Sequence, residues 1–161
     1  MATTTLTTAD ELLHLQLRTA LTMEDDSLAA LGVLAGAAKS ADIKKMFRHH
    51  AGETKEQIDN LHKIFKLLDI KVSPAPSPST KGISKQAESL IKKSAPALRD
   101  QVVLSSALGN EHYEIAAYES LIIPVKAMGA SDVLSLLKFN LDQETHTSEE
   151  LKAELQKRVA A

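Results

Sequence analysis

The hydrophobic and polar residues of the first 70 positions follow two helical patterns. Apolar residues recur every three or four positions from Leu13 to Ala35, and again from Ile43 to Leu68. A capping-box sequence at Thr8–Glu11 marks the start of the first pattern. The segment Gly36–Ser40 separates the two patterns, and Ser40 is suited to cap the second helix. The first half of the chain therefore predicts an antiparallel pair of helices.

The second half repeats this periodicity after a shorter element. A short amphipathic helix is predicted over Ile83–Lys93, with its lysines facing outward. Two longer patterns follow, from Leu104 to Val125 and from Leu134 to Leu155. Pro124 falls near the end of the third long helix, where we expect it to kink or stop that helix. The turn Met128–Ser131 then separates a second antiparallel pair.

A proline- and serine-rich tract joins the two pairs. Three of the five prolines fall within Ser73–Ser79, and such sequences favour extended conformations that cover distance efficiently. We therefore expect a long crossover at about residues 72–81. The predicted fold class is all-α: a ferritin-like four-helix bundle of two antiparallel hairpins with a long crossover and one short extra helix, forming a single domain over 1–161.

Composition narrows the classes of function. The aromatic content is 3%, and the chain has no cysteine, which excludes disulfides, thiolate zinc sites and a cysteine nucleophile. Nineteen basic and 21 acidic residues give a net charge of −2, so we expect no nucleic-acid partner. The first residues lack a basic and apolar leader pattern, and no apolar run is long enough for a bilayer. We expect a cytoplasmic protein without a membrane partner.

Carboxylates interrupt the apolar pattern of every long helix. Burying a lone carboxylate is costly, so each one either becomes protonated or finds a cation. No Lys or Arg occupies the patterns near these positions, which favours a metal ion over an internal salt bridge. Carboxylate ligands suit iron or manganese, and a bundle core lined by one Glu from each helix is a known form of two-metal site. The candidate carboxylate ligands are Glu24, Glu53, Glu111, Glu114 and Glu144.

Histidine and tyrosine add fewer candidates. His50 lies within the second pattern, one turn before Glu53, and completes the candidate metal ligands. His112 is placed to donate a hydrogen bond to a carboxylate, and Tyr118 either does the same or is satisfied in the core. The remaining histidines are predicted on the surface: His14, His49, His62 and His146. The alternative for the glutamates is that they lie at the edges of their patterns with their carboxylates in water.

Two segments carry a resemblance to a known family. The string Glu-His-Tyr-Glu-Ile-Ala-x-Tyr at 111–118, together with His50–Gln57, closely resembles the YciE/YciF-type ferritin-like stress proteins. The similarity covers residues 10 to 157. It implies a four-helix bundle, a homodimer, a role in bacterial stress responses and a centre of two metal ions. The spacing of Glu111 and Glu114 is also similar to the Glu-x-x-Glu of rubrerythrin-like di-iron proteins.

The sequence departs from the rubrerythrin-like pattern at two helices. Those proteins carry Glu-x-x-His, whereas this chain has Glu53-Thr54-Lys55-Glu56 and Glu144-Thr145-His146-Thr147. His50 is the imidazole available to substitute. Two functions follow from these features: a metal-binding protein that acts on peroxide or oxygen, or a non-catalytic structural or interaction protein with a degenerate metal site.

Overall fold

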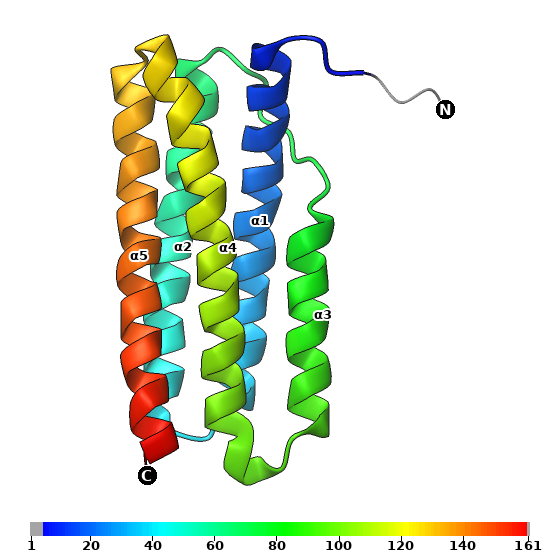
Figure 1. Ribbon diagram of the computed structural model, residues 1–161, viewed down its shortest axis with the longest axis vertical. Coiled ribbons are helices and arrows are strands. Elements are labelled where there is room, and N and C mark those ends of the chain that lie inside the picture. The colour runs from blue at the N-terminus through cyan, green and yellow to red at the C-terminus, as the bar shows by residue number, and fades with distance from the viewer. Residues whose placement is uncertain (1–4, 161) are drawn as a thin grey trace.

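The computed structural model describes residues 5–160, and the all-α prediction is confirmed (Figure 1). Long helices form two antiparallel hairpins, and a shorter helix lies between them in the sequence. A single 3₁₀ turn, Pro96–Leu98, leads into the second hairpin. The α-helices in chain order are α1 (Ala9–Ala37), α2 (Ala41–Leu67), α3 (Pro78–Lys93), α4 (Arg99–Met128) and α5 (Ser131–Ala160).

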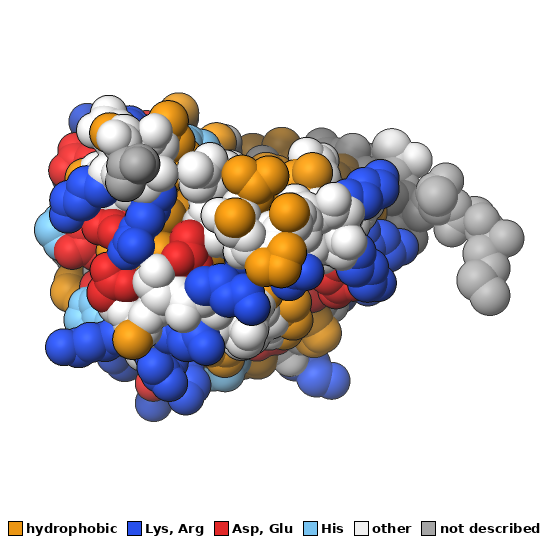
Figure 2. Space-filling view, turned by 90° about the horizontal axis from the view of Figure 1, so that it is seen from below, with side chains coloured by type: hydrophobic (Ala, Val, Ile, Leu, Met, Phe, Trp, Pro, Cys, Tyr) orange, Lys and Arg blue, Asp and Glu red, His pale blue; other side chains and the backbone are white. Residues whose placement is uncertain are grey.

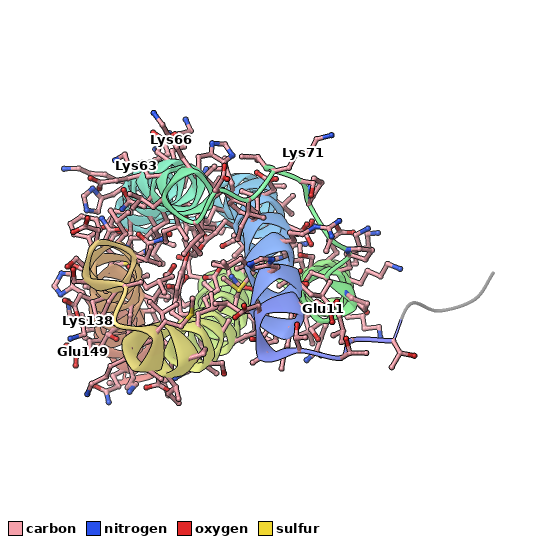
Figure 3. All side chains as sticks on the ribbon, turned by 90° about the horizontal axis from the view of Figure 1, so that it is seen from above. Glu11, Lys63, Lys66, Lys71, Lys138 and Glu149 are labelled. Atoms are coloured by element: carbon pink, nitrogen blue, oxygen red, sulfur yellow. The ribbon has the colours of Figure 1, made fainter. Side chains whose placement is uncertain are left out.

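The four long helices surround a common core. Seen from above in Figure 3, α1, α2, α5 and α4 stand around the core, and α3 lies outside it beside α1. Helix α1 packs against α2 and α4, α5 packs against the same two helices, and α3 contacts α1 and α4. The crossover of residues 68–77 and α3 together return the chain to the end where α4 begins, so that α2 and α4 run in the same direction (Figure 1).

Local sequence signals explain two of the helix ends. The backbone N–H of Glu11 donates to Oγ1 of Thr8, and the N–H of Thr8 donates back to Oε2 of Glu11, both at 3.1 Å. This is the capping box that the sequence predicts. Helix α4 ends before Gly129, whose φ of 71° lies in the left-handed region that glycine adopts without strain.

Two expected boundaries differ from the structure. Helix α3 begins at Pro78, five residues before the predicted start at Ile83, so the crossover spans 68–77 instead of 72–81. Proline fits the first turn of a helix because its missing N–H would have no helical partner there. Pro124 does not stop α4, which continues to Met128.

The turn between α1 and α2 is tied to the start of α4. Ser40 precedes α2 as predicted, but its hydroxyl donates to Asp100 instead of capping the helix. The Asp100 carboxylate also accepts the backbone N–H of Lys39 at 2.6 Å. At the same end, Nη1 of Arg158 on α5 donates to the hydroxyl of Ser40 at 3.1 Å, and Figure 2 shows basic and acidic side chains together around the end of α5. These contacts join the two hairpins at one end of the bundle.

Two apolar clusters fill the core, one toward each end of the bundle. One cluster contains Phe65 and Leu121, and the other contains Phe47 and Leu104. On α1 the change from one cluster to the other falls between Met23 and Leu31. The middle of the bundle is therefore left to polar side chains.

No helix within residues 5–160 is both long enough and apolar enough to cross a membrane.

Candidate metal centre

Four glutamates meet in the middle of the bundle. Three of them follow the apolar pattern of their helices and the fourth, Glu114, lies one turn after Glu111, so the same packing that buries leucine above and below also carries the carboxylates inward. None of the four side chains is more than 4% exposed. They are Glu24 on α1, Glu111 and Glu114 on α4, and Glu144 on α5.

The four carboxylates form one continuous cluster. One oxygen from each of Glu24, Glu114 and Glu144 lies within 4.8 Å of the others. The carboxyl group of Glu111 is hydrogen-bonded to that of Glu144. The alternative prediction, in which these glutamates point to water, is therefore wrong for all four.

Neighbouring polar groups satisfy part of this cluster. The hydroxyl of Tyr118 donates to Oε1 of Glu24 and accepts a hydrogen bond from Nδ2 of Asn140 at 3.0 Å. The side chains of Ser27 and Asn110 lie beside Glu114. One oxygen of each carboxylate is nevertheless buried without a hydrogen-bond partner: Glu24 Oε2, Glu111 Oε2, Glu114 Oε1 and Glu144 Oε1.

Burial changes the protonation of these groups. Loss of water raises the pKa of Glu24 to about 8, although the hydrogen bond from Tyr118 opposes the shift. Burial also raises the pKa of Glu111, Glu114 and Glu144 well above the ordinary value, and the neighbouring carboxylates add to each shift. Among the described residues, no salt bridge joins these four carboxylates to Lys or Arg.

Glu53 lies at the margin of the cluster. Its side chain is 20% exposed and accepts a hydrogen bond from Oγ1 of Thr147 at 3.4 Å. Its charge is close enough to raise the pKa of both Glu111 and Glu144. Helix α2 therefore contributes a carboxylate from the solvent side of the site.

His50 faces a different carboxylate. Its side chain is 3% exposed, and its Nε2 lies 3.1 Å from Oε2 of Glu150 on α5. The second ring nitrogen, Nδ1, is buried without a partner. Burial lowers the pKa of His50, while the contact with Glu150 opposes that shift, so the neutral imidazole is favoured.

The tyrosine and the other histidines considered as neighbours of the site differ in their exposure. Tyr118 is buried in the cluster, and His49, His62 and His146 are exposed as predicted, whereas His14 is half-buried. His112 is also exposed, which makes the predicted hydrogen bond to a carboxylate wrong, because it follows Glu111 directly and points about 100° away around the helix.

Sequence reasoning missed a pair of buried amides. Nδ2 of Asn60 donates to Oδ1 of Asn140 at 3.0 Å, and Asn140 in turn donates to Tyr118 and to the backbone carbonyl of Gln57. The sequence does contain an indication of it: Asn140 follows Leu137 by three residues and so occupies a position of the apolar pattern. An amide there costs less to bury than a charge, and for that reason it is a weaker signal.

The fold and the cluster together define a class. The protein is a four-helix bundle with ferritin-like connectivity, in which carboxylates from three helices meet at the core and a fourth helix adds Glu53 at the edge. Comparison with known proteins gives the family within this class.

The chain matches the family described as a domain of unknown function, DUF892, over residues 8–161. It is 27% identical to protein YciF of Escherichia coli (strain K12) over 143 residues, which cover 88% of this chain and 86% of YciF. The chain belongs to the DUF892 family, and its identification as a YciF-type protein is confirmed.

Solved structures share the fold over nearly the whole chain. YcfI from Rhodopseudomonas palustris is 29% identical with a TM-score of 0.90, covering 94% of this chain and 98% of its own. The crystal structure of the E. coli stress protein YciF is 24% identical with a TM-score of 0.91, covering 96% and 99%. A protein from Xanthomonas campestris pv. campestris is 20% identical with a TM-score of 0.76, covering 96% and 95%. The homodimer and the cytoplasmic location stay predictions.

Proposed function

We propose that this protein binds two divalent iron or manganese ions in the carboxylate cluster and acts on peroxide or oxygen during stress. The observation that carries the proposal is the set of four buried glutamates, each with one oxygen that no group of the protein satisfies. The E. coli relative is described as a stress protein, and we extend that role to this chain.

The donor set fits such ions. Glu24, Glu114 and Glu144 already hold oxygens close to one another, and these three would bind the first ion. Glu111 and Glu53 adjoin Glu144 and would supply oxygens to the second. Oxygen ligands suit Fe²⁺ and Mn²⁺, and a cation removes the repulsion that ionised carboxylates would otherwise have in the dry core.

The surrounding residues prepare the cluster for this role. When bound, a pair of such ions supplies the redox chemistry with oxygen or peroxide that the side chains lack. The apolar clusters on either side exclude bulk water. Tyr118 orients Glu24 through its hydrogen bond, and Asn140 orients Tyr118 in turn. Glu24 and Glu144 hold their protons until a cation displaces them.

Metal content and thermal stability test the proposal. Protein purified without chelator and then titrated with Fe²⁺ or Mn²⁺ should bind two equivalents and melt at a higher temperature. The double variant Glu111→Gln/Glu144→Gln should lose both effects. Glu149→Gln is the control, because it makes the same Glu-to-Gln substitution on the exposed side of α5, away from the cluster (Figure 3). A wild-type cluster that neither metal fills or stabilises would contradict the proposal.

A second candidate is a non-catalytic structural or interaction protein. The hydrogen bonds of Tyr118 to Glu24 and of Glu111 to Glu144 favour it, because protonated carboxyl groups can partly satisfy one another without metal. In that case the double Gln variant should be as stable as the wild type, and metal should leave both melting temperatures unchanged. Sedimentation of the same samples tests the predicted homodimer.

A further inference from the structure

Two imidazoles and a carboxylate meet where α2 and α5 pack together. Oε2 of Glu150 lies 3.1 Å from Nε2 of His50, and Oε1 of Glu150 lies 3.4 Å from Nε2 of His146. His50 belongs to α2, whereas His146 and Glu150 lie one turn apart on α5. One carboxylate therefore bridges the Nε2 atoms of two histidines on different helices.

We propose that His50, His146 and Glu150 form a second metal site, separate from the carboxylate cluster, that captures a divalent transition-metal cation at the protein surface. Two imidazole nitrogens and one carboxylate oxygen are a ligand set that suits Zn²⁺, Co²⁺, Ni²⁺ and Cu²⁺ better than Mg²⁺ or Ca²⁺. Three protein ligands also leave coordination positions open for water or for transfer of the ion.

The surroundings of His50 support a ligand role. Its ring is held by burial, so little conformational entropy is lost when its nitrogen binds a cation. Its Nδ1 has no hydrogen-bond partner in the protein. Moving the ring proton from Nε2 to Nδ1 would free Nε2 for a cation. The bond to the cation would then offset both the lost contact with Glu150 and the burial of an N–H without an acceptor.

The other two ligands are free to close around an ion. The side chains of His146 and Glu150 are 67% and 42% exposed, so both can rotate without disturbing the core. Glu150 now stands between the imidazoles, with a different oxygen on each. Both exposed side chains, His146 and Glu150, would rotate toward the fixed ring of His50 to bring the three donor atoms around one ion. The site thus has one fixed ligand and two mobile ones, open to solvent.

This surface site stands beside the buried cluster. Glu53 lies one turn after His50 on α2, and its Oε1 is 3.6 Å from Nε2 of the exposed His49. The charge of Glu53 raises the pKa of Glu111 and Glu144 in the buried cluster. A cation held by His50 would therefore have a partly exposed carboxylate as the next ligand on the way inward. This delivery role rests on the function proposed above, whereas the capture site does not.

A titration with Zn²⁺, in a variant whose buried cluster is disrupted, tests the capture site by itself. In the Glu111→Gln/Glu144→Gln background, calorimetric titration with Zn²⁺ should show one equivalent. Adding His146→Ala or Glu150→Gln should weaken that binding at least tenfold. His62→Ala is the control, because it removes an exposed imidazole from α2 that is not one of the three proposed ligands. Absence of submillimolar binding, or equal affinity after His146→Ala, would overturn the proposal.

Imidazole nitrogen spectra give an independent readout on the wild-type chain. Zn²⁺ should move the Nε2 resonances of His50 and His146 together, and leave those of His62 and His112 in place. Movement confined to other histidines would overturn the assignment.

Loading kinetics test delivery. Entry of Mn²⁺ or Fe²⁺ into the buried cluster should slow severalfold in His146→Ala, and equal rates would remove the delivery role. If the wild type binds a single equivalent that His146→Ala abolishes, the surface site stands and the buried two-metal centre fails.

Discussion

The hydroxyl of Tyr118 on α4 donates a hydrogen bond to Oε1 of Glu24 on α1. The same hydroxyl accepts a hydrogen bond from Asn140 on α5, so one buried group connects three helices. Because α1 belongs to the first hairpin and the other two helices to the second, this relationship fixes the position of Glu24 across the junction of the hairpins.

Removing this hydroxyl should destabilise the protein and loosen the cluster. Tyr118→Phe leaves Glu24 without its donor and Asn140 without one acceptor, which should lower the free energy of unfolding by about 1–3 kcal/mol. Urea denaturation measures the change. Tyr113→Phe on the same helix is the matched control, because Tyr113 is half-buried and lies outside the cluster. Equal losses in the two variants would show that the hydrogen bond contributes nothing specific.

Without metal, the protein should lose stability between pH 7 and 8. The pKa of Glu24 is about 8 in the folded chain and about 4.5 when unfolded, so the folded state retains a proton that the unfolded state has released. For each proton that only the folded state retains, the free energy of unfolding falls by about 1.4 kcal/mol per unit rise in pH, until the pH exceeds the pKa of the folded state. His50 has a lowered pKa and acts in the opposite sense only at lower pH.

Urea midpoints measured with chelator at pH 7 and 8 check this expectation. Glu24→Gln should make the dependence less steep, because the amide does not titrate, while Glu111, Glu114 and Glu144 still do. A wild-type midpoint that rises with pH over this interval would contradict the raised pKa.

With metal, the pH dependence should reverse. Carboxylates must release their protons to bind a cation, so alkaline conditions favour the loaded state. The rise in melting temperature caused by excess Mn²⁺ should therefore be larger at pH 8 than at pH 6. Scanning calorimetry measures both values, and the Glu111→Gln/Glu144→Gln variant should show no rise at either pH.

Two glycines should respond to alanine with opposite signs. Gly129 has a φ of 71°, so Gly129→Ala should lower stability by about 1 kcal/mol through backbone strain. Gly32 lies within α1 with open space where a Cβ would stand, and Gly32→Ala should raise stability by about 0.4–1 kcal/mol. Thermal unfolding of the two variants checks the contrast, and a gain at position 129 would contradict the assigned conformation.

The fold could be predicted because its signals are local and repeated. Apolar periodicity, the capping box at Thr8 and the glycine at 129 each reflect short-range geometry, and all agree with one another. The start of α3 was missed because Pro78 reads equally as part of an extended linker and as the first residue of a helix. The contact of Ser40 with Asp100 was beyond prediction, since the two lie 60 residues apart.

The site could be predicted in part. Glu24, Glu111 and Glu144 were evident because a charge at an apolar position is unusual. Glu114 is buried although its periodicity placed it nearer the edge of its pattern. The contact of His50 with Glu150 could not be predicted from the sequence, because it depends on how α2 and α5 align. Periodicity shows which way a side chain points, but only packing shows what it meets.

The crossover at 68–77 connects two halves of the chain, and each half carries part of the carboxylate cluster. Neither hairpin alone can assemble the cluster, because Glu24 comes from the first and Glu114 and Glu144 from the second. Assembly of the cluster therefore requires that both hairpins have formed and packed together. A nascent chain that has finished only its first half therefore carries Glu24 without the carboxylates of the second hairpin that complete the cluster.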